Sequence, residues 1–249
     1  MKYEFDTHTH TIVSGHAYST LLENAEYASK IGLKMIAVTD HGPAMPGGPH
    51  IFYFGNLRVV PDNLFGVEIL RGVEANILDH DGKLDIPYGI LKKLDLVIAS
   101  LHDVCIKPGS VEENTKALIN AMDNEYVDII GHAGNPAFPI DIDLFVEKAK
   151  EKDVLIEINN SSLGTSRIGS YDNCYKIAKK AKEIGAKVVM GSDAHICFDI
   201  GNFKLAADLI EKAGIPEENI MNTDVGKLKR YLSDKTKKVV TDFCRHQDD

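Results

Sequence analysis

The sequence predicts an α/β protein in which seven parallel β-strands close into a distorted (β/α)7 barrel. Short runs rich in Val, Ile and Leu alternate with amphipathic stretches along most of the chain, which is the pattern of βα units. These runs are nearly continuous apolar segments, as expected for parallel strands that helices cover on the outside. Seven such units in 249 residues, without a linker-like break in composition, favour one closed domain over two smaller ones.

The first helix has the clearest end signals. Thr20 and Glu23 have the spacing of a capping box, and the residues that follow are apolar at helical intervals. Gly32 can end this helix, because glycine readily adopts the left-handed backbone conformation that often follows a helix. We therefore expect a helix over residues 21–31, between the opening strand and the second one.

The other elements follow in regular alternation. The segment 42–61 is rich in Gly, Pro and aromatic residues, and we expect it to form an irregular connection over one end of the domain. The Asp-Gly pair at 81–82 predicts a small hairpin, and residues 236–249 are expected to form a solvated C-terminal tail. The expected strands cover 3–10, 35–40, 68–77, 94–102, 127–132, 154–160 and 186–195, and the other expected helices cover 110–123, 141–151, 170–184, 202–213 and 224–232.

Composition narrows the class of protein. The 28 basic and 37 acidic side chains give a net charge of −9, which argues against a long nucleic-acid track lined with cations. The chain shows neither a signal-peptide pattern nor an apolar run of the roughly 18 residues that a membrane span needs. We therefore expect a cytoplasmic protein that binds neither a membrane nor a long nucleic acid. Whether it forms a homo-oligomer is left open.

The cysteines point to no disulfide or metal motif. All four are widely spaced and form no C-x-x-C pair, so we expect reduced thiols without a catalytic role. Cys197 stands out, since it follows a candidate metal ligand by two residues. The four are Cys105, Cys174, Cys197 and Cys244.

Metal-capable side chains stand at the ends of the strands. Side chains alternate along a strand, so Asp6, His8 and His10 project from one face of the first strand, with Asp6 deepest and better suited to the barrel interior than to ligation. Six of the seven strands end near such a residue, and the C-terminal ends of barrel strands form one rim. The candidate ligands are His8, His10, His16, His41, Glu74, His102, His132, Asp193 and His195.

The number of these residues carries the argument. A single histidine after a strand is more often a hydrogen-bonded core residue than a ligand, but seven of the ten histidines fall at this one rim. The sixth strand alone lacks an obvious ligand and ends in Glu157, Asn159 and Asn160. The remaining histidines, expected to be structural or solvent-exposed, are His50, His80 and His246.

Nine ligands exceed what one tetrahedral site can use, so we expect two or three ions. Imidazole and carboxylate ligands without thiolate suit Zn, Mn or Fe. Closely spaced divalent ions bind phosphate oxygens, activate a bridging water and stabilise the leaving oxygen. The spacing therefore predicts a phosphoester hydrolase.

The candidate ligands belong to longer motifs that resemble a known family. The motifs are Asp6–Thr11, Val38–Gly42, the strand with Glu74, His102, Gly131-His132 and Gly191–His195. Together they resemble the polymerase and histidinol phosphatase (PHP) family over about residues 1–235. The segments that look like its stand-alone YcdX-type phosphatase branch are Ser19-Thr20, Leu70–Ile77 and Glu157–Ser162.

This resemblance implies a distorted seven-stranded barrel of the PHP type, a single domain over 1–249, with three ions, usually zinc, at its C-terminal rim. By the family pattern, the first ion would take His8, His10, Glu74 and Asp193, the second would share Glu74 and add His102 and His132, and the third would take His16, His41 and His195. Spacing alone indicates the convergence and the number of ligands, not this grouping.

The resulting hypothesis is hydrolysis of small phosphomonoesters by a metal-bridging hydroxide, without a side-chain nucleophile. Asp40 can orient a ligand imidazole, relay a proton or cap the end of its strand. Arg167, in a loop rich in Gly and Ser, can bind phosphate through its planar fork or remain solvated. The segment 43–61 can lie over the mouth of the site or form a covered apolar loop.

Two other functions stay open. The nearer is a phosphodiesterase or exonuclease acting on nucleotides, although the net charge of −9 weighs against long polymers. The second is a non-catalytic metal-binding module, since degenerate PHP domains occur, but those lose ligands and this chain keeps all nine. A small phosphorylated substrate is therefore expected, and nothing in the sequence selects histidinol phosphate among such substrates.

Overall fold

The computed structural model of the chain describes residues 1–236. Its strands are β1 Phe5–Thr9, β2 Met35–Val38, β3 Asn63–Leu64, β4 Val67–Asn76, β5 Leu96–Ser100, β6 Ile129–Ile130, β7 Leu155–Asn159 and β8 Val188–Gly191. Its α-helices are α1 Leu21–Lys30, α2 Phe52–Asn56, α3 Tyr88–Leu91, α4 Val111–Ala121, α5 Ile142–Glu151, α6 Ser170–Ile184, α7 Lys204–Ala213 and α8 Val225–Thr236. Every strand and every helix that the sequence predicts is present, with ends shifted by a few residues.

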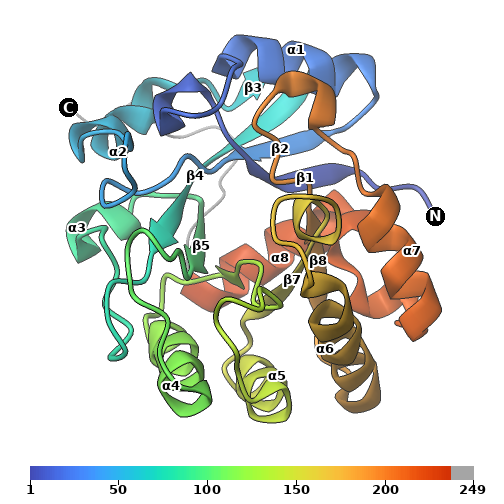
Figure 1. Cartoon of the computed structure of the whole chain (residues 1–249). Helices are drawn as coiled ribbons and strands as arrows, with labels where there is room; N and C mark the ends of the chain where they lie inside the picture. Colours follow the sequence, from blue (N-terminus) through green and yellow to red (C-terminus); the bar gives the residue numbers. More distant parts are fainter. Residues whose placement is uncertain (237–249) are drawn as a thin grey trace.

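Seven strands form a parallel sheet in the order β1-β2-β4-β5-β6-β7-β8, and the short β3 pairs antiparallel with β4. The sheet closes on itself between β8 and β1. There the Asp193 N–H donates to the carbonyl of His8 at 2.9 Å, and the His10 N–H donates to the carbonyl of Ala194 at 2.9 Å. The nearly closed seven-stranded barrel confirms the predicted fold (Figure 1).

Asp6 stabilises this closure. Its carboxylate is fully buried, and Oδ1 accepts the N–H groups of His8 at 3.2 Å and Ser192 at 3.1 Å. The other oxygen accepts the N–H of Gly201 at 2.9 Å. Asp6 therefore ties β1 to the segment that follows β8, in agreement with its expected place inside the protein rather than among the ligands.

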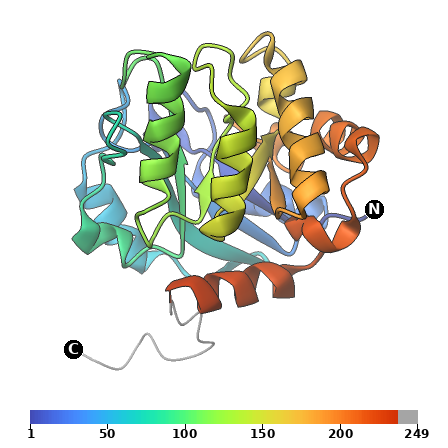
Figure 2. The same cartoon turned by 90° about the horizontal axis from the view of Figure 1, so that it is seen from below.

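Helices cover the outside of the barrel. α4, α5 and α6 stand side by side along strands β5 to β8 in both views (Figures 1 and 2). They bury a large apolar cluster against outward-facing strand residues such as Val97, Ile130 and Ile156. α8 instead lies across the end of the barrel at which the parallel strands begin (Figure 2).

The barrel interior changes character from one end to the other. At the end covered by α8, Phe5, Met35 and Leu70 pack against Leu228 and Leu232 of that helix. At the opposite end, the inward positions of the strands carry imidazoles and carboxylates. Barrel interiors are filled in layers of this kind. An apolar layer therefore seals one end, and the polar residues gather at the C-terminal rim.

Two local signals read from the sequence are confirmed. The Thr20 side chain accepts the N–H of Glu23, and the Glu23 carboxylate accepts the N–H of Thr20, so the capping box of α1 is complete. Gly82 has a φ of +80° in a turn whose flanking residues Ile77 and Leu84 pair antiparallel. This is the expected hairpin.

Three short elements, α2, α3 and β3, do not appear in the sequence-based prediction. The segment 42–61, expected to be irregular, contains α2 and the single 3₁₀ turn Leu57–Val59. β3 pairs with β4 through a turn in which Phe65 and Gly66 have φ values of 54° and 82°. Unlike the predicted strands of similar length, these elements do not lie in runs rich in Val, Ile and Leu, and they are too short for a helical period.

The tail predicted from residue 236 onward lies outside the described residues, apart from Thr236 at the end of α8. Within residues 1–236, no helix combines the length and the apolar character that crossing a membrane requires.

Candidate metal centre

The barrel brings the nine predicted ligands together at its C-terminal rim. His102, His132 and Asp193 each stand two residues past the last residue of β5, β6 and β8. A step of two keeps the phase of a strand, so His102 and Asp193 continue the inner face of the barrel. His132 instead follows the outward-facing Ile130 by two residues, and its φ of 30° marks a break in strand geometry at the point where its ring turns to Glu74. The cluster therefore arises from the register of distant strands rather than from a local motif.

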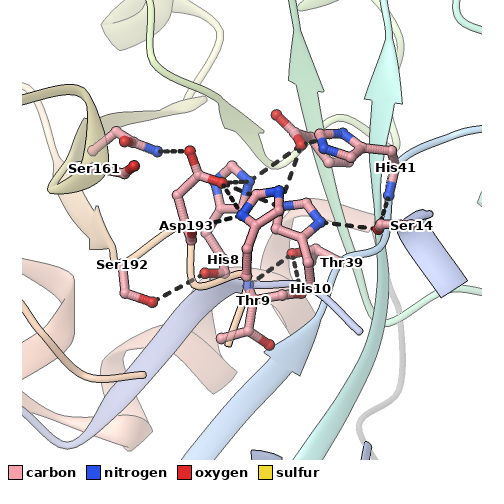
Figure 3. A network of polar contacts seen from close by, with 12 residues as sticks. His8, Thr9, His10, Ser14, Thr39, His41, Ser161, Ser192 and Asp193 are labelled. Carbon is pink, nitrogen blue, oxygen red and sulfur yellow. Dashed lines mark hydrogen bonds and ion pairs between the residues drawn. The ribbon is translucent and has the colours of Figure 1, made fainter. Parts of the chain in front are cut away.

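The remaining imidazoles reach the same point from other segments. Figure 3 shows His8 and His10, from the end of β1, and His41, after β2, pointing toward one another. His16, in the loop after β1, lies at the outer edge and is solvent-exposed. Its ring centroid lies 5.0 Å from that of His41 and 4.8 Å from that of His195.

Glu74 lies at the middle of the cluster and is fully buried. Its Oε1 lies 2.8 Å from Nε2 of His132 and 3.3 Å from Nε2 of His102. Its Oε2 lies 2.7 Å from Nδ1 of His41 and 3.3 Å from Nε2 of His8. Each carboxylate oxygen thus faces its own group of imidazoles, a placement that suits a ligand shared by two ions.

Asp193 directs one carboxylate oxygen at the imidazoles of the cluster and the other at the side chains of Arg167 and Asn159. Its Oδ1 lies 3.2 Å from Nε2 of His10 and 3.6 Å from Nε2 of His8. Its Oδ2 accepts hydrogen bonds from Nη1 of Arg167 at 2.9 Å and from Nδ2 of Asn159 at 3.3 Å. The carboxylate is therefore held from behind, with Oδ1 directed at the imidazoles.

Several buried nitrogen and oxygen atoms of this cluster lie close together but do not form hydrogen bonds with one another. Within residues 1–236, six of them have no hydrogen-bond partner: Nε2 of His8, His10 and His102, Nδ1 of His41, Oε2 of Glu74 and Oδ1 of Asp193. Leaving one buried polar atom unpaired costs roughly 1–3 kcal/mol. Six such atoms around one point indicate that another group belongs there.

The donor set fits divalent metal ions, because imidazole nitrogens and carboxylate oxygens are ligands of Zn, Mn and Fe. The described part of the chain contains three groups of potential metal ligands, and the ligand atoms within each group lie within 4.8 Å of one another. The groups are His10, His41 and His195; His8, His10 and Asp193; and His41, Glu74 and His102. His41 belongs to two of these groups. It lies near His195, with which the family pattern groups it, and also near Glu74.

Hydrogen bonds on the far side of two rings fix which nitrogen faces the cluster. Nδ1 of His8 lies 2.6 Å from Oε1 of Glu157, and Nδ1 of His102 lies 2.7 Å from Oδ1 of Asn76. The amide nitrogen of Asn76 donates to Asp85 at 2.6 Å, which leaves its oxygen to accept from His102. Both rings therefore carry a proton on Nδ1 and direct Nε2, the nitrogen that would bind a metal ion, at the centre.

Asp40 acts on the cluster through a serine. Its carboxylate accepts the N–H of Thr11 at 2.7 Å, the Ser14 hydroxyl at 2.7 Å and the Tyr53 hydroxyl at 2.6 Å. A hydroxyl has one proton, so Ser14 must accept from Nδ1 of His10, 3.2 Å away. Asp40 therefore holds the group that fixes the His10 ring and is also tied to the segment 43–61.

Burial and neighbouring charges set the protonation of the cluster. Burial opposes ionisation of Glu74, but the imidazoles of His41 and His8 hold the pKa of its carboxyl well below the usual range. Burial, followed by the charge of Arg167, lowers the pKa of His132 to about 4. An ionised Glu74 and a neutral His132 are the forms that bind metal ions near neutral pH.

The cluster opens into a cavity of about 710 Å³. Arg167 lines it with a side chain that is 15% exposed, and its Nη1 donates to Asp193 at 2.9 Å and to Ser162 at 3.0 Å. Met45 lines the cavity as well. The aromatic residue Phe52 instead lines a separate hollow of about 740 Å³ beside α2. The segment 43–61 therefore reaches the site through Met45 and the Tyr53 hydroxyl.

Three positioning residues were not singled out from the sequence: Ser14, Asn76 and Glu157. For Glu157 a signal exists, because it occupies the inward phase of β7 between Leu155 and Asn159, where an apolar residue is expected. Asn160, beyond the same strand, instead accepts the N–H groups of two residues at the start of α7.

The other histidines and the cysteines lie apart from the cluster or outside the described residues. His50 packs edge-on against Phe52, with ring centroids 4.5 Å apart, and His80 lies partly buried in the 77–84 hairpin. Cys105, Cys174 and Cys197 are free thiols, as expected. His246 and Cys244 fall outside the described residues.

Known proteins share both the sequence and the fold. A family model described as the PHP domain matches residues 6–163. The protein belongs to the PHP family. A protein named "Probable phosphatase" from Thermoanaerobacter sp. (strain X514) is 61% identical over 240 residues, which cover 96% of this chain and 98% of that protein. A relative of the same description from Caldanaerobacter subterraneus subsp. tengcongensis is 62% identical over 235 residues, 94% of this chain and 92% of that protein.

Among solved structures, this PHP protein is similar to histidinol phosphate phosphatase from Lactococcus lactis subsp. lactis in complex with zinc, L-histidinol and phosphate. The TM-score is 0.61 at 18% identity, and the match covers 86% of this chain and 95% of that one. At this identity the similarity shows the fold, a PHP barrel. The close relatives and the imidazole–carboxylate cluster together support a metal-dependent hydrolase.

Proposed function

We propose that this PHP protein is a metal-dependent phosphatase that hydrolyses small-molecule phosphomonoesters at a trinuclear site. One observation carries the proposal: Oε2 of Glu74 and five buried nitrogen and oxygen atoms around it have no hydrogen-bond partner among the described residues, next to a cavity of about 710 Å³. The relatives named as phosphatases, 61% and 62% identical, support the same class of reaction.

The nine rim residues would hold three divalent ions, with zinc as the first expectation and Mn or Fe as alternatives. Such ions, when bound, lower the pKa of a water, bind phosphate oxygens and stabilise the charge of the leaving oxygen. Glu74 would be shared between ions, because its two oxygens face different imidazoles. Glu157 and Ser14 fix the rings of His8 and His10 with Nε2 toward the centre.

Arg167 and Asp40 have different parts in this proposal. The Arg167 guanidinium uses Nη1 to hold Asp193, and its planar fork borders the cavity where a phosphate group would lie. It would bind a phosphate oxygen and neutralise negative charge. Asp40 contributes by orienting His10 through Ser14, not by accepting a proton from the substrate.

The lining of the cavity favours a small ester over a polymer. Arg167 is the single Lys or Arg among the described residues that line it, whereas Asp103 and Asp199 are acidic. A nucleic-acid chain needs several cations to neutralise its phosphates. This charge distribution supports a monoester phosphatase more than the alternative, a nucleotide phosphodiesterase or exonuclease.

The test begins with elemental analysis of the purified full-length protein. Phosphate release is then compared among p-nitrophenyl phosphate, its bis-ester and short oligonucleotides, followed by sugar phosphates, nucleotides and cofactor phosphates. We expect bound divalent metal, faster hydrolysis of the monoester than of the diester, loss of activity with a chelator and recovery when metal is added back.

A matched pair of histidine variants completes the test. His8→Ala should lose both metal and hydrolysis, while His50→Ala, which lies outside the cluster, should keep both. Native metal content and activity in His8→Ala would reject the site. A preference for the diester would reject the monoesterase, and metal binding without any hydrolysis would favour the non-catalytic module.

A further inference from the structure

Glu157 is a buried carboxylate at the cluster that is not among the nine proposed ligands. It is 3% exposed and lies on the inner face of β7. Its Oε1 lies 2.6 Å from Nδ1 of His8, and its Oε2 accepts the backbone N–H of His132 at 2.8 Å. It therefore holds two proposed ligands from different strands, on the sides that face away from Glu74.

Gly191 on the neighbouring strand β8 makes room for this carboxylate. A Cβ atom at Gly191 would lie 2.1 Å from Oε1 of Glu157 and 2.6 Å from the Cβ of His8. A Cβ atom at Gly131 would lie 2.3 Å from Oγ of Ser100 and 3.5 Å from Oε2 of Glu157. Close-packed interiors do not tolerate such short approaches without movement. A side chain at Gly191 would therefore displace Glu157, whereas one at Gly131 would collide with Ser100 and only touch Glu157.

The hydrogen bonds define what Glu157 does in this position. An ionised carboxylate only accepts, so Nδ1 of His8 carries a proton and Nε2 is the ring nitrogen that faces Glu74, 3.3 Å away. The second oxygen holds the backbone of His132, whose φ of 30° is uncommon for a residue with a side chain. One carboxylate thus sets the tautomer of one ligand and the backbone of another.

We propose that Glu157 is a positioning residue that holds His8 and His132 ready to bind metal. The effect on metal binding rests on the proposed function, whereas the contact with His8 can be tested without it. An imidazole ligand that donates its second N–H to a carboxylate is fixed in orientation and more basic. Loss of such a partner typically lowers metal affinity by about 10- to 100-fold.

Glu157→Gln is the sharpest variant, because the amide keeps the shape but replaces one acceptor oxygen with a donor. If the amide oxygen stays on the His132 N–H, the NH₂ group faces Nδ1 of His8 and favours the opposite tautomer, with a proton directed into the cluster. If the amide is flipped, its NH₂ group meets the His132 N–H, donor against donor. Either arrangement disturbs one of the two ligands.

The variant is compared with the wild type as full-length proteins. Zinc affinity is measured by competition with a chelator, the His8 tautomer by ¹⁵N NMR of the imidazole, and phosphate release over a range of zinc concentrations. We expect Glu157→Gln to bind zinc about 10- to 100-fold more weakly and to recover part of its activity at high zinc concentration.

Asp128→Asn is the matched control. Asp128 is also a fully buried carboxylate that accepts a backbone N–H, that of Val97 at 2.8 Å, but it precedes β6 at the sealed end of the barrel. We expect this variant to lose stability and keep wild-type zinc affinity. Equal losses of zinc affinity in both variants would mean a general effect of barrel stability and would overturn the proposal.

The remaining outcomes decide whether Glu157 has this positioning role. Wild-type zinc affinity in a folded Glu157→Gln variant would overturn the positioning role. If that variant does not fold, the wild-type spectrum decides: a proton on Nδ1 of His8 supports the inference, and a proton on Nε2 overturns it. A wild-type protein without bound metal would refute the proposed function, while the same spectrum would still test the contact between Glu157 and His8.

Discussion

Nδ1 of His41 lies 2.7 Å from Oε2 of Glu74, and the two residues form a parallel bridge between the ends of neighbouring strands. The imidazole reaches the carboxylate with the nitrogen nearer to its own backbone, because β2 and β4 are adjacent in the sheet. The opposite oxygen of Glu74 lies 2.8 Å from Nε2 of His132, on the far side of the cluster. Glu74 thus connects imidazoles that come from opposite parts of the rim.

Glu74→Gln should therefore affect more than one ion. The substitution removes the negative charge that faces both groups of imidazoles, and we expect lower metal content and a fall in hydrolysis of at least about a hundredfold. Metal analysis and kcat/KM for p-nitrophenyl phosphate measure the two effects. Glu68→Gln is the control, because Glu68 lies at the other end of β4 and pairs with Lys229 at 2.7 Å. Full metal content in Glu74→Gln would contradict the shared-ligand role.

Arg167→Ala should lower turnover while metal content stays native. The loss of a charge-assisted hydrogen bond to phosphate costs roughly 1.5–3 kcal/mol, which corresponds to about a ten- to hundredfold lower kcat/KM. Arg167→Lys should fall in between, since an ammonium group cannot form the planar fork. Unchanged kinetics would remove Arg167 from the site. A loss of metal parallel to the loss of activity would mean that it acts only through Asp193.

Asp40→Asn should destabilise the protein more than Tyr53→Phe. The Asp40 carboxylate accepts from Thr11, Ser14 and Tyr53, so an amide NH₂ group at this position would face donors, at a cost of roughly 1–3 kcal/mol. Burial and the nearby Asp40 raise the pKa of Tyr53, which keeps its hydroxyl a donor. Tyr53→Phe loses one bond, worth about 1 kcal/mol. Urea unfolding of the three proteins checks this order, and equal stabilities would contradict it.

The thiol of Cys174 should resist alkylation in the folded protein. Burial, followed by the charge of Glu157, raises its pKa from 9.0 to about 12, so at pH 8 the reactive thiolate is about a thousandfold rarer than in the unfolded chain. The folded state holds this proton more tightly than the unfolded chain does. The contribution of the thiol to the free energy of unfolding is therefore fully present below pH 9.0 and is lost as the pH rises toward about 12. Iodoacetamide labelling followed by mass spectrometry, with and without urea, measures the difference. Equal labelling rates would contradict the burial of Cys174.

The sequence was sufficient for the parts of the structure that depend on periodicity and on strand ends. The alternation of apolar runs and amphipathic stretches predicted the barrel, and the metal-capable residues after the strands predicted one rim. This works because parallel barrel strands share a direction, so that residues such as His102 and His132 must meet even though their contact is not encoded locally.

The partners of the proposed ligands could not be predicted in the same way. That Glu157 lies beside His8, and Asn76 beside His102, depends on the register between strands and on where the barrel closes. Gly191, which makes room for Glu157, is likewise uninformative until the strands are aligned. β3 was missed for a different reason, because Asn63–Leu64 does not lie in an apolar run, whereas the equally short β6 lies in one.

The seal formed by α8 has a consequence for turnover. Leu228 and Leu232 pack against the apolar layer at one end of the barrel, and the Tyr231 hydroxyl lies 2.8 Å from the carbonyls of both Asp128 and Asp153. In a phosphatase with one sealed end, the substrate and the products pass through the same entrance of the active site. Released phosphate leaves by the route along which the next substrate ester arrives. Before it leaves, it contacts the same residues that bind the phosphate group of the substrate. The rate of such an enzyme follows the ratio of ester to free phosphate in its surroundings, so product inhibition by phosphate should be competitive.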